Sequence, residues 1–210
     1  MSWIRTANIM APAVYMKCSR SEVLRLLSVD STDAWLAARA LNQAAVLEVL
    51  PHNRAIVAFG DLFCSAQTPI TQNICYLVIE LVGGSNPKQR DTARLNDYMA
   101  NFPGGGSLKQ LAHYGQLMHT HCEEFRQFDY GLLNFGRYGA ASPPKYNVRP
   151  AGECNLTIIY GLNDLLAVKS SIDKIHCQIP NSTIVVVSDP EWTHFDFIIG
   201  LGIKEYVNDG

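Results

Sequence analysis

The sequence predicts an α/β fold in which short parallel strands form a sheet. Two β-branched runs, 156–160 (LTIIY) and 183–187 (TIVVV), have the continuous apolar composition of strands that are buried on both faces. Between them, apolar residues recur at spacings of four, three and four, as on one face of a helix. These residues are Val168, Ile172, Ile175 and Ile179. A strand, a helix and a strand in this order predict a βαβ unit, whose two strands run in parallel.

A further strand is expected near the start of the chain, within residues 7–16 (ANIMAPAVYM). Pro12 would end this strand or mark its exit, because proline cannot donate a hydrogen bond to a sheet. The sheet would therefore receive one strand from the beginning of the chain and at least two from its end.

Between these strands, from about residue 19 to 125, most apolar residues follow helical spacing. Turn signals at Gly83-Gly84, Asn86-Pro87 and 103–106 divide the segment into several short helices. The apolar positions are Val23, Leu24, Leu26, Leu27, Trp35, Leu36, Leu41, Val46, Leu47, Leu50, Ile74, Leu77, Val78 and Leu81. A helical excursion of this size between two strands is typical of a cap that covers a site.

Composition excludes several classes of protein. With 210 residues and 48% hydrophobic residues, the chain can bury a core. Its net charge of −2 and the absence of a run of like charges argue against nucleic acid as a partner. The longest apolar runs are shorter than the roughly 18 residues of a transmembrane helix. We also expect no signal peptide in this chain, because its start has no compact charged region followed by an uninterrupted apolar stretch.

No metal or cofactor site is expected. The six cysteines form no C-x-x-C pair, so a zinc ribbon is not indicated. His119 and His121 alternate within HTHC and would point to different faces of a helix. The glycine-rich stretch 101–107 (NFPGGGS) has neither the preceding strand nor the lysine of a phosphate-binding loop.

Two side chains follow the predicted strands closely. Asp164 lies four residues beyond 156–160, and His194 lies seven residues beyond 183–187. Parallel strands bring the loops at their carboxyl ends to one edge of the sheet, where catalytic groups are usually found. A carboxylate at this edge could fix the tautomer of the imidazole and leave its second nitrogen free to take a proton. We therefore expect Asp164 and His194 to form a catalytic pair.

Other interpretations of the same residues remain open at this stage. Asp196 competes as the partner of His194, although residues two apart do not face each other if a helix opens at 194. His194 alone could be a packing or surface residue. Asp164 could simply cap the helix that follows it.

Several ordered motifs carry a resemblance to a known family. They are FRQFDYG (125–131), SPPKYNV (142–148), YGLNDLLA (160–167), IPN (179–181) and PEWTHFDFIIG (190–200), with MAPAVYMK and FPGGGSLKQLAHYGQ before them. Together they resemble the acid lipases, an α/β-hydrolase group that includes gastric, lysosomal and many insect lipases. The resemblance covers nearly the whole chain and is strongest from about residue 102.

The resemblance implies a fold and an activity. The fold would be an incomplete α/β-hydrolase sheet, made of the C-terminal parallel strands, with a helical cap. Residues 1–17 would form the strand before the cap, 18–124 the cap, and 125–210 the C-terminal core. The activity would be hydrolysis of a triacylglycerol or cholesteryl ester in lipid catabolism, with no cofactor. In this family the catalytic triad runs Ser, Asp, His along the chain, and Asp164 and His194 match the last two members.

The resemblance also implies a cap that contacts the lipid interface and a secreted or lysosomal location. Cys64 and Cys75 match a cap disulfide of the family. For an exported protein, the sequons at Asn155 and Asn181 would be glycosylation sites. Asn181 is the better candidate, because Asn155 is expected to open a buried strand.

The chain departs from the family at the nucleophile. It contains no G-x-S-x-G motif, and the serine in 104–108 (GGGSL) is expected to lie in a loop. Without the nucleophile, the chain alone is expected to be a very poor hydrolase. Two interpretations follow: a partial record of a full lipase, or a short non-catalytic protein that binds lipid or a partner. The sheet edges left by missing strands also predict poor solubility.

Overall fold

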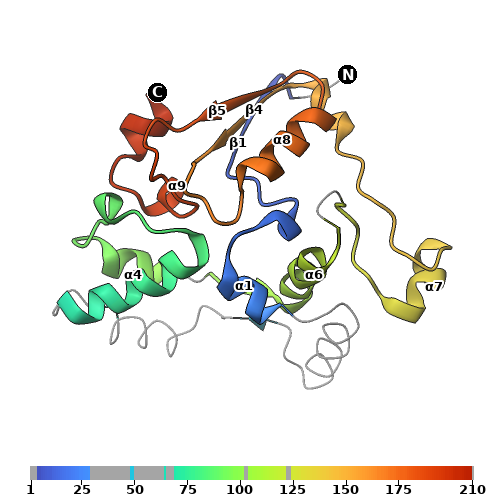
Figure 1. Cartoon of the computed structure of the whole chain (residues 1–210), viewed down its shortest axis with the longest axis horizontal. Helices are drawn as coiled ribbons and strands as arrows, with labels where there is room; N and C mark the ends of the chain where they lie inside the picture. The colour runs from blue at the N-terminus through green and yellow to red at the C-terminus, as the bar shows by residue number, and fades with distance from the viewer. Residues whose placement is uncertain are drawn as a thin grey trace.

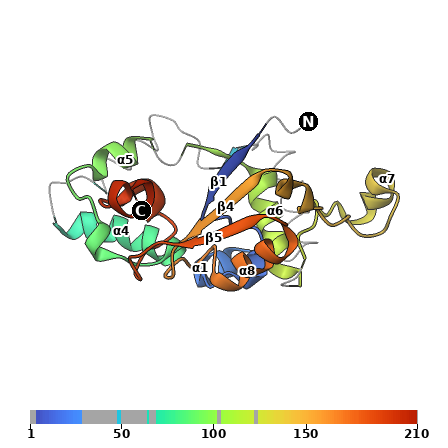
Figure 2. The ribbon, with the colours of Figure 1, turned by 90° about the horizontal axis from the view of Figure 1, so that it is seen from above.

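The computed structural model describes residues 4–28, 48–49, 64, 69–101, 104–121 and 124–209. Its main sheet has three strands in the order β1-β4-β5, with β4 in the centre (Figures 1 and 2). Both strand pairs are parallel. The strands are β1 (Thr6–Met10), β4 (Asn155–Tyr160) and β5 (Ser182–Val186). The α/β fold class is confirmed, as is the early strand, which ends two residues before Pro12.

The predicted βαβ unit is present. Helix α8 (Lys169–Gln178) connects β4 to β5 and lies along the sheet in Figure 1. Its apolar face is buried: Ile172 is fully covered, and Ile175 and the C-cap residue Ile179 are nearly so. These side chains join Ile158 of β4 and Trp192 in one hydrophobic core. The helical spacing in the sequence therefore marked the face that packs against the sheet.

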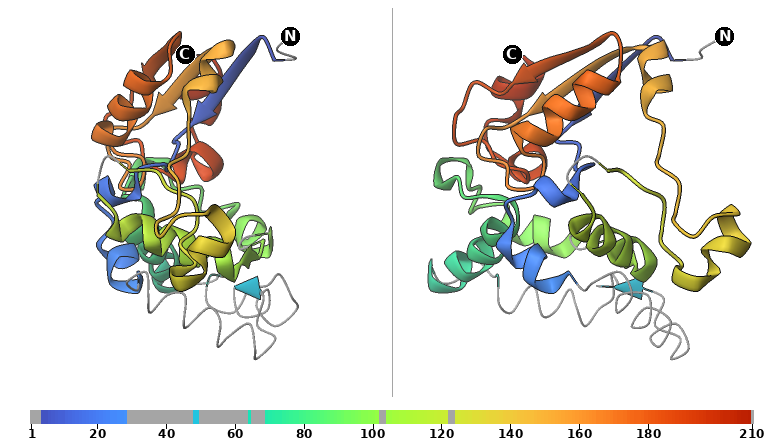
Figure 3. Two further views of the ribbon diagram at one scale, coloured as in Figure 1. Left: turned by 90° about the vertical axis from the view of Figure 1, so that its right-hand side faces the viewer. Right: turned by 45° about the vertical axis from the view of Figure 1, so that its right-hand side comes forward.

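The helices from the earlier part of the chain lie below the sheet in the views of Figure 3. The remaining α-helices are α1 (Glu22–Leu27), α4 (Pro69–Gly83), α5 (Leu95–Asn101), α6 (Leu108–His119), α7 (Asn134–Tyr138) and α9 (Asp196–Ile199). Short 3-10 helices are η1 (Met16–Cys18), η2 (Pro87–Gln89), η3 (Gly131–Leu133) and η4 (Arg149–Glu153), and a π-helical turn, η5 (Lys204–Asn208), follows α9. Among the described residues, no helix is long and apolar enough to cross a membrane.

The prediction that both β-branched strands are buried on both faces is wrong for β5. Val185 is 40% exposed and Val186 is 45% exposed. In the described sheet β5 lies at one edge, so it has a strand neighbour on one side, whereas β4 has one on each. The composition TIVVV could not distinguish an edge strand from a central one, because β-branched residues suit both positions.

Two short segments differ from their predicted structure. Glu48 and Val49 fall within a stretch whose spacing predicts helix, and Gly106 and Ser107 fall within the predicted loop 104–108. Instead β2 (Glu48–Val49) and β3 (Gly106–Ser107) pair in antiparallel. This ladder joins parts of the chain that are distant in sequence, so local spacing gave no signal of it. The other residues of 29–63 that carried the helical prediction lie outside the described part of the chain.

Exposed apolar side chains gather on α4 and on the segment formed by η3 and α7. On α4, the residues that gave the helical spacing face outward and are each at least half exposed. They are Ile74, Leu77, Val78 and Leu81, with Ile70 one turn earlier. The second surface belongs to η3 and α7, which lie away from the sheet in Figure 1 and carry Leu132, Leu133 and Phe135.

A carboxylate clamp holds the segment that leads from α6 towards α7. The Glu124 carboxylate accepts hydrogen bonds from Nε and Nη2 of Arg126 and pairs with Lys145 at 3.0 Å. Arg126 also donates to the carbonyl of Pro143 at 2.7 Å. The hydrogen bonds from Arg126, followed by that from Lys145, lower the pKa of Glu124 to about 2.

This clamp predicts acid-dependent stability. The pKa of Glu124 is lower in the folded chain than in the unfolded chain, so between these two values the unfolded chain binds more protons. The stabilisation is therefore complete above about pH 5 and declines as the pH falls towards 2. Urea unfolding of the wild type and Glu124→Gln should show a stability difference at pH 6 that shrinks by pH 2. A difference independent of pH would contradict the clamp.

Candidate active site

The carboxyl ends of β4 and β5 bring Asp164 and His194 together. The imidazole Nδ1 of His194 lies 3.0 Å from Oδ2 of Asp164, although the residues are thirty positions apart in sequence. The Asp164 side chain is fully buried, whereas the His194 side chain is 21% exposed. The arrangement is that of an oriented imidazole: one nitrogen faces a buried carboxylate, and the other can exchange a proton with a substrate.

The local backbone fixes Asp164 as well. Its second oxygen, Oδ1, accepts hydrogen bonds from the amides of Leu166 at 2.7 Å and Ala167 at 2.8 Å. The carboxylate thus closes the bend that follows it, while Oδ2 remains available to His194. The alternative that Asp164 caps the following helix is wrong, because the N-cap residue of α8 is Val168. The Asp164 side chain can therefore bond the backbone through one oxygen and orient His194 through the other.

Asp196, the competing candidate for the partner of His194, contacts Thr193 and Asn86 instead. Its Oδ2 accepts from the amide of Thr193 at 2.8 Å and from Nδ2 of Asn86 at 3.2 Å. Burial raises the pKa of Asp196 above its ordinary value. Asp196 therefore stabilises the backbone of the histidine loop, while Asp164 contacts the ring.

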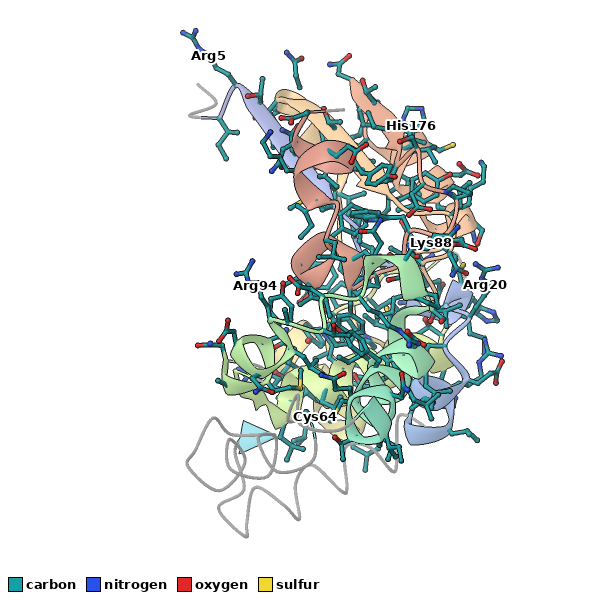
Figure 4. All side chains as sticks on the ribbon, turned by 90° about the vertical axis from the view of Figure 1, so that its left-hand side faces the viewer. Arg5, Arg20, Cys64, Lys88, Arg94 and His176 are labelled. Atoms are coloured by element: carbon teal, nitrogen blue, oxygen red, sulfur yellow. A yellow bond between two sulfur atoms is a disulfide. The ribbon has the colours of Figure 1, made fainter. Side chains whose placement is uncertain are left out.

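The turn that ends α4 is the part of the site that sequence reasoning missed. The carbonyl of Gly83 accepts hydrogen bonds from the amides of both Leu165 and His194, each at 3.2 Å. Lys88, labelled in Figure 4, lies in η2, shortly after this turn, and pairs with Glu191 at 2.8 Å. The Gly-Gly dipeptide was visible in the sequence, but it predicted only a turn.

A mainly apolar cavity of about 320 Å³ lies beside the histidine loop. It is formed where α4 and α5 face α9, and Phe195, the residue after His194, is part of its wall. The other lining residues are Ile79, Arg94, Asp97, Tyr98, Met99, Asn101, Ile198 and Ile199. Arg94 is labelled in Figure 4. A cavity of this size is at the lower end of the range for small-molecule sites.

The remaining predicted site residues are also placed. Cys64 and Cys75 form a disulfide, as the resemblance implied. Asn181 and Asn155 are both exposed, so the argument that Asn155 is buried is wrong: it occupies the exposed first position of β4. Within the described residues, no group of three or more His, Cys, Asp or Glu side chains could hold a metal ion.

Comparison with known proteins shows that this chain is similar to several lipases. Lipase 3 of Drosophila melanogaster is 30% identical over 210 residues, which is 98% of this chain and 51% of that protein. Lipase member N of Homo sapiens is 33% identical over 65% of this chain and 35% of its own length. Human lysosomal acid lipase/cholesteryl ester hydrolase is 29% identical over 73% of this chain and 38% of its own length. The chain thus spans at most about half the length of these relatives. No family model matches it.

Proposed function

Because the chain belongs to the acid lipase-like family of the α/β-hydrolase fold and fits its C-terminal part, we propose that it supplies the acid–base half of a carboxylic ester hydrolase. The observation that carries the proposal is the 3.0 Å contact between His194 and the buried Asp164. Because these 210 residues contain no G-x-S-x-G motif, the proposal assigns the nucleophilic serine to another part of the enzyme.

In this mechanism, His194 takes the proton of the serine hydroxyl as the serine attacks the ester carbonyl. The same imidazole then gives the proton to the leaving alcohol. Asp164 keeps the proton on Nδ1, so that Nε2 is the acceptor, and its negative charge stabilises the imidazolium. A second cycle with water as nucleophile releases the carboxylic acid and restores the serine.

We further propose a lipid ester as the substrate, with residues 18–124 as the cap. The apolar cavity between α4, α5 and α9 supports this proposal, because it would accept part of an acyl chain next to Phe195. The names of Lipase 3 and of lysosomal acid lipase/cholesteryl ester hydrolase support the same class of substrate. A secreted or lysosomal location, with glycosylation at Asn181 or Asn155, also belongs to this proposal.

A fusion tests the function. The part of Lipase 3 that this chain does not match is placed before residues 1–210, and turnover of a p-nitrophenyl ester is measured. We expect turnover that falls by at least about 10³-fold in His194→Ala, because removal of a triad member leaves only weak catalysis. His176→Ala is the matched control, since His176 contacts Ser182 away from the site. A folded fusion whose turnover is equal in both variants would refute the proposal.

A second function is supported by a separate observation. The exposed apolar face of α4, with Ile74, Leu77 and Val78, has the character of a helix that binds a lipid surface. A non-catalytic lipid-binding protein would therefore retain emulsion binding in His194→Ala and lose it in Leu77→Asp. Flotation of the 210-residue chain with a triacylglycerol emulsion measures this directly. Binding without turnover in any fusion would favour this second function.

A further inference from the structure

The turn after α4 contacts both loops that carry the candidate site. The Gly83 carbonyl holds the amides of Leu165 and His194, as described above, and the Ser85 carbonyl accepts from Nδ2 of Asn163 at 2.8 Å. The two loops also bond each other, from the amide of Asn163 to the carbonyl of Trp192. The turn is therefore a third element that sets the distance between the Asp164 loop and the His194 loop.

The side chain of Asn86 extends this contact into the histidine loop. It is 3% exposed, and its Nδ2 donates to Oδ2 of Asp189 at 3.1 Å and to Oδ2 of Asp196 at 3.2 Å. The same oxygen of Asp196 accepts the amide of Thr193, which immediately precedes His194. Two buried hydrogen bonds thus connect Asn86, through Asp196, to the amide of Thr193, the residue before His194.

The charges around Asn86 make its amide group a specific requirement. Asp189 and Asp196 are both buried, and without a donor between them their carboxylates would repel each other. Gln89 donates to the same oxygen of Asp189 at 3.2 Å, and Lys88 pairs with Glu191 at the surface of the same loop. An amide at position 86 can donate to both carboxylates, whereas a third carboxylate there could donate to neither.

We propose that Asn86 is a positioning residue, which acts through Asp196 to hold His194 in hydrogen-bonding contact with Asp164. The importance of this role for catalysis rests on the proposed function, but the effect on His194 does not. Asn86 contacts no reacting atom. Replacement of Asn86 should change which ring nitrogen of His194 carries the proton, in addition to any change in the stability of the fold.

The test uses ¹⁵N NMR of the 210-residue chain, which reports whether Nδ1 or Nε2 of His194 carries the proton. In the wild type we expect the proton on Nδ1, facing Asp164. In Asn86→Ala and in the isosteric Asn86→Asp we expect loss of the Nδ1 proton signal or a mixture of tautomers. Lys88→Ala is the matched control, because it removes a surface ion pair two residues from Asn86 and should leave the His194 signals unchanged.

A second readout separates positioning from simple unfolding. The main-chain amide signals of β4 and β5 report whether the sheet is intact, and we expect them to stay at their wild-type positions while the His194 signals change. Unchanged His194 signals in both Asn86 variants, or a loss of the sheet signals that accompanies every change at His194, would overturn the proposal. If His194 carries its proton on Nδ1 in the fusion but the fusion has no turnover, the proposed function alone is refuted.

Discussion

Replacement of Asp164 by alanine is expected to destabilise the chain by about 3 kcal/mol or more. The substitution leaves the amides of Leu166 and Ala167 and the Nδ1 proton of His194 without their buried acceptor. Each buried donor without a partner costs about 1–3 kcal/mol. Urea unfolding of the 210-residue chain measures the loss, and Asp173→Ala is the control, because the carboxylate of Asp173 is exposed and pairs only with Lys169 in the described structure.

Asp164→Asn should separate the two functions of this side chain. The asparagine oxygen can still accept the amides of Leu166 and Ala167, so most of the stability should remain. Its Nδ2, however, would donate to Nδ1 of His194 and move the ring proton to Nε2, the nitrogen that must accept a proton. In the fusion with Lipase 3, we therefore expect turnover to fall by about 10⁴-fold while the unfolding midpoint changes little. Unchanged turnover in a folded Asp164→Asn fusion would show that Asp164 only supports the fold.

The sequence could predict the contact between Asp164 and His194 because it depends on order and direction alone. Two β-branched runs joined by a helix form parallel strands, and parallel strands place their following loops at one edge. Once β4 and β5 pair in this way, the two side chains need only lie a few residues beyond the strand ends. No tertiary information beyond the βαβ rule was required.

The turn after α4 could not be predicted in the same way. Gly83 contributes a carbonyl group, which every residue has, and Asn86 contributes an amide to two carboxylates more than a hundred positions away. Nothing in the local pattern around GGSNP reports these partners. The glycines are explained only by the structure: a Cβ on Gly84, whose φ is +113°, would lie 2.3 Å from the carbonyl oxygen of Asn163. The exposure of β5 and the pairing of β2 with β3 depend on contacts of the same long-range kind.

Gly161 offers the sharpest test of the packing between the two site loops. It directly follows β4, and a Cβ at this position would lie 2.2 Å from the carbonyl oxygen of Trp192 and 2.9 Å from Cδ1 of its ring. Trp192 is fully buried in the core, and its carbonyl accepts the amide of Asn163. Gly161→Ala must therefore push the histidine loop away from the Asp164 loop. We expect a loss of about 2–4 kcal/mol, from overpacking and from the weakened hydrogen bond between the loops.

Gly136→Ala is the matched control for this substitution. Gly136 lies within α7, and a Cβ there would meet no heavy atom within 4 Å. Since alanine is favoured over glycine in a helix by about 0.5–1 kcal/mol, this variant should be neutral or slightly more stable. In Gly161→Ala the ¹⁵N signals of His194 should also change, because the added methyl group acts on the loop that carries the ring. Equal stability of the two alanine variants would mean that the loops carrying Asp164 and His194 do not approach each other this closely.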